Sequence, residues 1–232
     1  MATGLLYDVH GNLPALEAVL ADARDTDVTQ WVLGGDYCSF GAWPAEVVAR
    51  LDELNGAAWI RGNWDRWQRG ERDDMPPGED LQTALVSVVE ALGPDLIARL
   101  AELPTKHREG DVLFCHGAPN TDMDSFLPHA ADADDALLAG VDAQTIVFGH
   151  THLPVDRRHD GIHLVNPGSV GLPFDGDQRA HWAVLHDDGR AEPRRVSYDI
   201  EAAIAGLHER YPGAPWIGGT TARLRRASFT GE

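Results

Sequence analysis

Apolar runs of strand length alternate with segments of helical periodicity, and this alternation constrains the fold more than any other feature of the chain. The first unit has a strand-like run at 4–7, a turn at His10-Gly11-Asn12 and a helical segment from Leu13 to about Arg24. The second unit has a strand-like run at 31–35, a helical segment at 44–54 and a third strand at 57–60. This order of elements predicts an α/β fold.

The rest of the chain predicts further elements. Charges, two adjacent prolines and a glycine predict a loop at 66–78, followed by a helical pattern at 81–103 that breaks at Gly93-Pro94. Strands are expected at 111–115 and 145–148, with a helix at 133–138 between them. The strand-like runs 162–165, 182–185 and 195–198 follow one another without helices, which favours antiparallel pairing. A capped helix is expected at 200–207, and the tail after Gly213 has no clear pattern.

The composition fits one domain, 1–232, and limits the partners. The chain has 232 residues, is 43% hydrophobic and has a net charge of −18, which argues against long nucleic acid as a partner. No apolar run in the sequence is long enough for a membrane span. The N-terminal residues do not have the pattern of a signal peptide. Cys38 and Cys115 do not indicate a disulfide framework. We therefore expect a cytoplasmic protein. The segment 66–103, with its charged loop and helical pattern, is the candidate for a lid or an interface.

Polar side chains follow the ends of the predicted strands. Each motif alone is weak, because Gly-Asp and Gly-Asn can be turns and a lone histidine often belongs to the core. In open α/β sheets, however, ligands bind at the carboxyl edge of the strands, where these side chains would converge. Seven O and N ligands would suffice for two divalent ions. The candidates are Asp8, His10, Asp36, Asn63, His116, His150 and His152.

The order of these motifs resembles that of the calcineurin-like metallophosphoesterases. The family pattern Asp-x-His, Gly-Asp, Gly-Asn-His-Asp, Gly-His and Gly-His-x-His is met in order across residues 8–152, with Cys115 in place of one glycine. The segment 166–171, Asn-Pro-Gly-Ser-Val-Gly, is similar to a signature of the small bacterial and archaeal branch. The resemblance implies an α+β sandwich of two mixed sheets packed face to face and flanked by helices in four layers, αββα, with a metal site at the C-terminal strand edge.

The resemblance also implies roles for individual residues. Asp8, His10 and His152 would hold one ion, Asn63, His116 and His150 the other, and Asp36 would bridge them. Mn²⁺ is the expected metal, with Fe²⁺, Co²⁺, Ni²⁺ and Zn²⁺ as alternatives. A hydroxide held between the ions would attack phosphorus, as in other two-metal sites. Asp36, Asn63 and Asp65 are the candidate catalytic residues, and Asn12, Trp64 and Gly117 the candidate substrate contacts.

Trp64 departs from the family pattern, which has histidine at this position. Tryptophan cannot protonate a leaving group at neutral pH, so substrates with acidic leaving groups, such as aryl phosphates or pyrophosphate-linked nucleotides, are expected. Asp65 would then lose its family role and pair with Arg61 or Arg66. Phe40 and Tyr37 are candidates for the leaving-group pocket.

Two functions remain open from the sequence. The first is a phosphoesterase acting on a small phosphate ester, with a phosphodiester or a nucleotide preferred to a monoester and a homodimer as a further expectation. The second is a scaffold that binds a protein partner, since a retromer subunit of this fold also has a bulky aromatic residue in place of the catalytic histidine. All seven expected ligand positions are kept here, which favours the enzyme.

Overall fold

The computed structural model describes residues 2–230. Its strands and helices, in chain order, are β1 Ala2–Leu6, α1 Leu13–Ala23, β2 Val28–Leu33, α2 Pro44–Asp52, β3 Ala58–Trp59, α3 Asn63–Arg69, α4 Glu79–Leu92, α5 Pro94–Ala101, β4 Lys106–Glu109, β5 Val112–Cys115, α6 Asp134–Leu138, β6 Thr145–Val147, β7 Val155–His159, β8 Ile162–Asn166, β9 Ala180–His186, β10 Ala191–Val196, α7 Ile200–Arg210 and α8 Trp216–Arg226.

The strands form two mixed sheets of five strands each. The first has the order β10-β9-β1-β2-β3, in which β1, β2 and β3 are parallel and β9 and β10 are antiparallel to their neighbours. The second has the order β4-β5-β6-β8-β7, in which β5, β6 and β8 are parallel and the edge strands β4 and β7 are antiparallel. Each sheet therefore has a parallel part whose carboxyl ends can carry a site.

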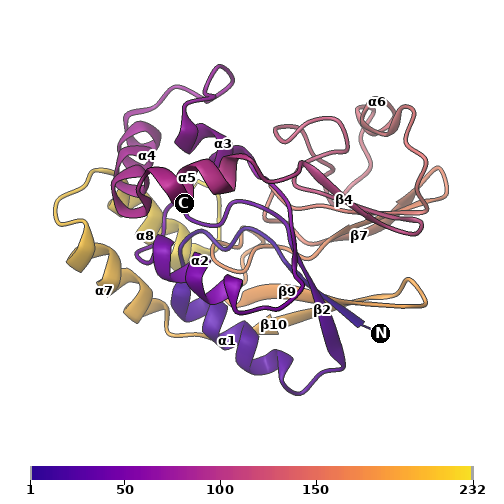
Figure 1. Ribbon diagram of the computed structural model, residues 1–232, viewed down its shortest axis with the longest axis horizontal. Coiled ribbons are helices and arrows are strands. Elements are labelled where there is room, and N and C mark those ends of the chain that lie inside the picture. Colours follow the sequence, from indigo (N-terminus) through magenta and orange to yellow (C-terminus); the bar gives the residue numbers. More distant parts are fainter. Residues whose placement is uncertain (1, 231–232) are drawn as a thin grey trace.

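The two sheets pack face to face. Leu5, Tyr7 and Val32 of the first sheet region share one buried cluster with Phe114 and Val147 of the second. A second cluster joins the outer face of the first sheet to α1 and α2, and a third joins the second sheet to Leu138 of α6. Figure 1 shows α1 beneath the first sheet and α6 beyond the second. The predicted sandwich with helices on both outer sides is thus confirmed.

Most of the predicted elements are present. The helical pattern breaks at Gly93 as expected, with α4 ending at Leu92 and α5 beginning at Pro94. Gly93 has a φ of 74°, which a glycine adopts at low cost, and Pro94 occupies the first turn of the next helix. Local sequence was sufficient here because both signals act through the backbone.

The structure corrects four predictions. The segment 66–78 begins as helix, because α3 extends to Arg69 with Trp64 and Trp67 buried. The tail after Gly213 contains α8. The strands β4 and β7 were not predicted, because these charged edge strands lack the apolar alternation by which buried strands are recognised. Finally, β8 does not pair with β9, since it lies between β6 and β7 in the other sheet, whereas β9 and β10 are antiparallel as expected.

No helix within residues 2–230 combines the length and apolar character needed to cross a membrane.

Candidate metal centre

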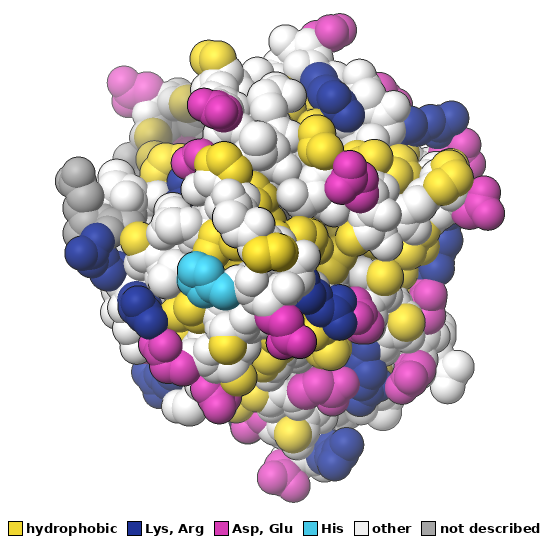
Figure 2. All heavy atoms as spheres, turned by 90° about the vertical axis from the view of Figure 1, so that its left-hand side faces the viewer, with side chains coloured by type: hydrophobic (Ala, Val, Ile, Leu, Met, Phe, Trp, Pro, Cys, Tyr) yellow, Lys and Arg dark blue, Asp and Glu magenta, His cyan; other side chains and the backbone are white. Residues whose placement is uncertain are grey.

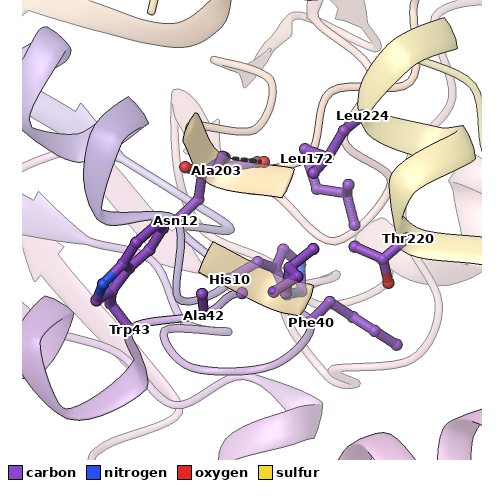
Figure 3. Close-up of a pocket in the computed structure, with 12 residues that line it drawn as sticks. His10, Asn12, Phe40, Ala42, Trp43, Leu172, Ala203, Thr220 and Leu224 are labelled. Atoms are coloured by element: carbon purple, nitrogen blue, oxygen red, sulfur yellow. Dashed lines mark hydrogen bonds between the residues drawn. The ribbon is translucent and has the colours of Figure 1, made fainter. Parts of the chain in front are cut away.

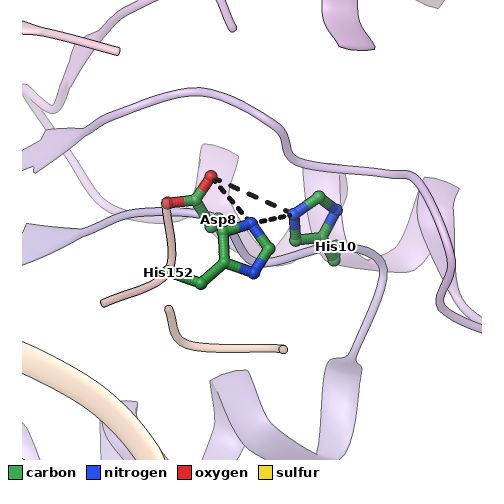
Figure 4. Close-up of side chains that lie close together, drawn as sticks. All are labelled: Asp8, His10 and His152. Carbon is green, nitrogen blue, oxygen red and sulfur yellow. Dashed lines mark hydrogen bonds and ion pairs between the residues drawn. The ribbon is translucent and has the colours of Figure 1, made fainter. Parts of the chain in front are cut away.

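The seven candidate ligands come together at the carboxyl edge of the strands. They follow strands β1, β2, β3, β5 and β6, with Asn63 as the first residue of α3, and six of them are buried while His150 is partly exposed. One group consists of Asp8, His10 and His152 (Figure 4), with the Nε2 atoms of the two histidines 3.0 Å apart. Asp8 Oδ1 lies 3.5 Å from His152 Nε2 and 4.0 Å from His10 Nε2.

The second group contains Asn63, His116, His150 and Asp36. Asn63 Oδ1 lies 3.1 Å from His116 Nε2 and 3.0 Å from His150 Nδ1. Asp36 Oδ2 lies 3.5 Å from His116 Nε2. The two groups adjoin, because Asp8 Oδ1 is also 4.0 Å from His116 Nε2.

Hydrogen bonds orient the lone pairs of the histidines toward the centre. His116 Nδ1 lies 2.8 Å from the Gly34 carbonyl and His152 Nδ1 lies 2.5 Å from the Leu172 carbonyl. A carbonyl can only accept, so both rings carry their proton on Nδ1 and present an unprotonated Nε2 to the centre when neutral. This arrangement of a ligand nitrogen and a carbonyl partner is typical of metal-binding histidines.

The donor set fits divalent cations. Asp8 Oδ1 is buried without a hydrogen-bond partner, which is costly for a carboxylate unless a cation neutralises it. Two nitrogens that bind one ion at about 2.1 Å and at a right angle lie about 3.0 Å apart, which is the separation of His10 Nε2 and His152 Nε2. The residues present can therefore hold metal ions in both groups.

Most of these residues have a left-handed backbone. The φ angles of Asp8, His10, Asp36, His150 and His152 lie between 50° and 66°, a region that non-glycine residues rarely adopt and that concentrates at functional sites. Hydrogen bonds hold two of these turns: His10 N donates to Asp36 O at 3.0 Å, and His150 N donates to Asp8 Oδ2 at 3.0 Å.

Two glycines before the ligands permit the close packing of the site. A Cβ at Gly62 would lie 2.2 Å from Asp36 Oδ1, and a Cβ at Gly149 would lie 2.6 Å from Asp8 Oδ2. Both distances are far below a van der Waals contact. The glycine in each motif is thus explained by the approach of another ligand's carboxylate.

The expected pairing of Asp65 with Arg61 or Arg66 is wrong. The Asp65 carboxylate is buried and accepts hydrogen bonds from the backbone N–H of Gly62 at 2.8 Å, Asp36 at 3.0 Å and Tyr37 at 3.4 Å. Burial, followed by repulsion from the Asp36 carboxylate, raises the pKa of Asp65 to about 7. Asp65 therefore ties the Asp36 loop to the start of α3 and positions the Asp36 carboxylate, which itself accepts from Trp64 N at 3.0 Å.

Arg66 instead joins two loops to α3 by paired hydrogen bonds. It donates to both oxygens of Asp74, at 2.9 and 2.5 Å, and to both oxygens of Asp122, at 2.7 and 2.8 Å. These contacts attach the segments around Asp74 and Asp122 to α3, next to the candidate ligand Asn63.

The electrostatics of the centre couple its carboxylates to its histidines. Burial opposes protonation of His116, but the carboxylates of Asp36 and Asp8 outweigh it and raise the pKa of His116 to about 10. Burial and then the neighbouring His152 lower the pKa of His10 to about 4. The pKa of Asp36 is lowered because His116 outweighs the effect of burial. Without metal, the centre thus holds a proton on His116 that a bound cation would displace.

Two of the expected substrate contacts are engaged in the protein itself. Asn12 Oδ1 caps α1 by accepting from Ala15 N at 3.3 Å, and its Nδ2 donates to Gly171 O at 2.9 Å and to the Tyr198 hydroxyl at 3.2 Å. A Cβ at Gly117 would lie 2.6 Å from the Asp124 carbonyl, so close packing accounts for this glycine. Their roles in substrate binding stay predictions.

A cavity of about 730 Å³ opens over the centre. Five of the seven candidate ligands line it, together with Phe40 and Trp64 as predicted. The Trp64 ring packs edge to face against Phe40, with 4.7 Å between ring centroids. Tyr37 does not line this cavity, contrary to expectation, because it is fully buried with its hydroxyl bonded to the Leu33 and Ile60 carbonyls.

The sequence analysis did not predict that the C-terminal tail reaches this site. Trp216 and Arg223 of α8 and the following Phe229 line the cavity. The buried residues Trp216, Ile217, Thr220 and Leu224 repeat at helical spacing, which is the signal that could have revealed the helix. Two glycines and three arginines in the same helix obscure it.

Helix α8 also packs closely behind His10. A cavity of only about 10 Å³ separates Thr220 and Leu224 of this helix from His10, Phe40 and Leu172 (Figure 3). This space holds about one water molecule. The C-terminal helix α8 therefore packs against the loop that carries His10.

Comparison with known proteins agrees with the fold. The sequence pattern of the calcineurin-like phosphoesterase superfamily domain matches residues 1–189. Phosphodiesterase YfcE of Escherichia coli K12 is 30% identical over 190 residues, which cover 78% of this chain and 85% of YfcE. The uncharacterized protein MJ0912 of Methanocaldococcus jannaschii is 28% identical over 236 residues, 92% of this chain and 94% of MJ0912.

A solved structure has the same fold over nearly the whole chain. The metallophosphoesterase from Sphaerobacter thermophilus superposes with a TM-score of 0.83 at 28% sequence identity, covering 98% of this chain and 99% of the other. The sequence match and the fold lead to one conclusion: the chain belongs to the calcineurin-like phosphoesterase superfamily.

Proposed function

We propose that the protein is a dinuclear metal-dependent phosphoesterase that hydrolyses a small phosphodiester or nucleotide-type substrate. The observation that carries the proposal is the convergence of seven carboxylate, amide and imidazole side chains beneath one cavity, with Asp8 Oδ1 buried and without a hydrogen-bond partner. Phosphate esters are anions, and a protein of net charge −18 needs a local positive centre to bind them.

The proposed ligand sets follow the two groups of side chains. Asp8, His10 and His152 would hold one ion, Asn63, His116 and His150 the other, and Asp36 would contact both, with Mn²⁺ as the expected metal. When bound, such ions supply Lewis-acid charge to phosphoryl oxygens and lower the pKa of a coordinated water molecule.

The chain's own residues would position these groups. The carbonyls of Gly34 and Leu172 hold the His116 and His152 rings with Nε2 facing inward. Asp65 fixes the Asp36 loop against α3 through backbone hydrogen bonds. Such fixed geometry lowers the reorganisation that the reaction requires.

Trp64 would contact the leaving group without protonating it. Its side chain lines the cavity, and its indole N–H has no hydrogen-bond partner among the described residues. This N–H can donate to an ester oxygen, but it cannot release a proton at neutral pH. A preference for acidic leaving groups, as in aryl or pyrophosphate-linked esters, follows.

The diester preference is supported by the relative that is named a phosphodiesterase and by the apolar walls of the cavity, which suit a second ester group. Trp67, Pro76 and Leu81 of the segment 66–103 form part of these walls, so we propose that this segment covers the substrate as a lid. A homodimer and a cytoplasmic location stay predictions from the sequence.

Hydrolysis of bis-p-nitrophenyl phosphate and p-nitrophenyl phosphate by chelator-stripped protein tests the proposal. Mn²⁺, Fe²⁺, Co²⁺, Ni²⁺, Zn²⁺ or Mg²⁺ would be added back singly, with the bound metal counted by mass spectrometry. We expect metal-dependent turnover, faster for the diester. The Asp36→Ala variant should lose both turnover and metal, whereas Asp25→Ala, an exposed aspartate in the loop after α1, should keep both.

Absence of turnover with every ion, in protein that binds two metals, would refute the enzyme and favour the scaffold. A fully active Asp36→Ala variant would refute the shared carboxylate between the two ions.

A further inference from the structure

Arg223 is the only lysine or arginine that lines the large cavity within the described part of the chain. It projects from α8 between two aromatic rings, with its guanidinium carbon 5.7 Å from the centroid of Phe40 and 5.3 Å from that of Phe229. Its Nε donates to the Phe229 carbonyl at 2.9 Å. The side chain is therefore held in a defined place.

The terminal nitrogens of Arg223 have no hydrogen-bond partner within residues 2–230. No carboxylate lies within ion-pair distance of them, although Asp80 of α4 faces the same cavity and interacts with the guanidinium at longer range. By contrast, Arg225 on the same helix forms an ion pair with Glu201 at 2.8 Å. Burial lowers the pKa of Arg223.

A partly buried cation without a paired anion costs free energy in the empty protein. That cost is recovered when a ligand brings the anion into the cavity. Arg223 is such a cation, whereas Arg66 forms ion pairs with Asp74 and Asp122.

Aromatic side chains line the path between the candidate ligands and Arg223. Phe174 stacks on His152, with 4.4 Å between centroids and 14° between planes, and Phe229 lies 5.5 Å from Phe174. On the other side, Phe40 lies 6.0 Å from the His10 ring and directly beneath the Arg223 guanidinium. Two rings, Phe229 and Phe174, therefore separate the guanidinium from His152, and one ring, Phe40, separates it from His10.

The mouth of this cavity exposes apolar surface. Phe229 is 66% exposed and Leu127 is 49% exposed, and these are two of the three large hydrophobic residues that are exposed in the described chain. Figure 2, which views the side of the molecule with α4, α7 and α8, shows hydrophobic side chains exposed among charged ones. Exposed rings beside a cavity favour a flat apolar ligand.

We propose that the substrate carries an aromatic ring system and a second anionic group in addition to the phosphoester that is cleaved, and that Arg223 binds this second anion. Esters of nucleoside diphosphates are the chemical class that fits. The inference rests on the proposed function and names its substrate class. Arg223 is then a specificity-determining residue.

The positions of the candidate metal centre and of Arg223 support a substrate with two phosphoryl groups. One phosphoryl group would lie at the metal centre and the second at Arg223, because guanidinium forks bind phosphate oxygens in pairs. Asp124 also lines the cavity, and its carboxylate disfavours an anion beside it. The residues from 190 onward, which carry Arg223 and Phe229, lie outside the part that matches the superfamily pattern.

Binding of ADP and adenosine to the full-length, chelator-stripped protein tests the inference without any turnover. Trp64, Trp67 and Trp216 line the cavity, so ligand binding can be followed by tryptophan fluorescence. We expect Arg223→Gln to weaken ADP binding about 10-fold to 100-fold and to leave adenosine binding unchanged. Arg223→Lys should retain part of the affinity, and Arg226→Gln, an exposed arginine of the same helix, should retain all of it.

Kinetics with the metal-loaded enzyme provide a second measurement. Arg223→Gln should raise KM for the p-nitrophenyl ester of a nucleoside diphosphate by a much larger factor than KM for bis-p-nitrophenyl phosphate, because the latter has no second anion. A structural defect would instead weaken ADP and adenosine equally, and that result would overturn the inference.

The two proposals fail in different ways. Turnover of bis-p-nitrophenyl phosphate without binding of ADP would overturn the substrate class and leave the phosphoesterase intact. Arg223-dependent binding of ADP without turnover of any ester would support the anion site and refute the proposed reaction.

Discussion

The Nε2 atoms of His10 and His152 lie 3.0 Å apart, although 142 positions separate the two residues in the sequence. Two neutral imidazole nitrogens at this distance gain nothing from each other unless a proton or a cation lies between them. Asp8 Oδ1, 3.5 Å from His152 Nε2 and without a hydrogen bond, completes the triad. The folded protein therefore gathers electron pairs that a cation would stabilise.

Metal should accordingly stabilise the fold. An ion at 100 times its dissociation constant adds about 2.7 kcal/mol per site, which for a protein of this size raises Tm by about 5–11 °C. Differential scanning fluorimetry with Mn²⁺ and with a chelator measures the shift. His152→Ala should reduce the shift, and His208→Ala, an exposed histidine of α7, should leave it unchanged. An equal shift in both variants would contradict the assignment of His152.

Replacing Trp64 with histidine should restore a proton donor to the cavity. Leaving-group protonation contributes roughly 10²–10⁴-fold where it operates, so activity on alkyl phosphodiesters should rise more than activity on aryl phosphodiesters. Rates with one substrate of each kind measure the difference. Trp67→His is the control, because Trp67 also lines the cavity but its indole donates to Asp74 at 2.9 Å. Equal changes for both substrates would refute the leaving-group argument.

Gly62→Ala should abolish the site while Gly218→Ala should not. The new Cβ at position 62 would lie 2.2 Å from Asp36 Oδ1, so metal binding and turnover should both fall below detection. Gly218 is exposed in α8 with nothing within 4 Å, and alanine there should stabilise the protein by about 0.5–1 kcal/mol. Metal content, turnover and urea unfolding distinguish the two variants. A Gly62→Ala protein that retains both metals would contradict the packing argument.

The Arg66–Asp74 ion pair should stabilise the fold only above strongly acidic pH. The hydrogen bond from Arg66 lowers the pKa of Asp74 from 3.8 to about 2. Because the folded pKa is depressed, the stabilisation is complete above the unfolded value and is lost as the pH falls through about 2.

Urea unfolding of wild type and Asp74→Asn at pH 6 and at pH 2 measures this effect. At pH 6 the variant should be less stable, by about 1 kcal/mol or less because Asp74 is half exposed, and at pH 2 most of the difference should vanish. Asp73→Asn, the exposed neighbour, should match wild type at both values. A difference that persists at pH 2 would show that shape, and not charge, is responsible.

Much of the fold and of the candidate site was accessible from local sequence. The beginning of α7 after its cap Asp199 and the break between α4 and α5 at Gly93-Pro94 follow from local signals that act on the backbone directly. The candidate ligands could be named because each follows an apolar run of strand length. The environment of Asp65 could not, since two of its three backbone donors, Asp36 and Tyr37, lie in the loop after β2, far from Asp65 in the sequence.

The sequence by itself determined the alternation of strands and helices and the residues that end the strands, because these depend on periodicity and on the nearest neighbours in the chain. Only the tertiary structure decided that β8 belongs to the second sheet and that α8 reaches the cavity. Only it places Arg223 beside Phe40 without an anionic partner. Such contacts join segments far apart in the chain, and their free energy comes from burial and charge that exist only once both segments are folded.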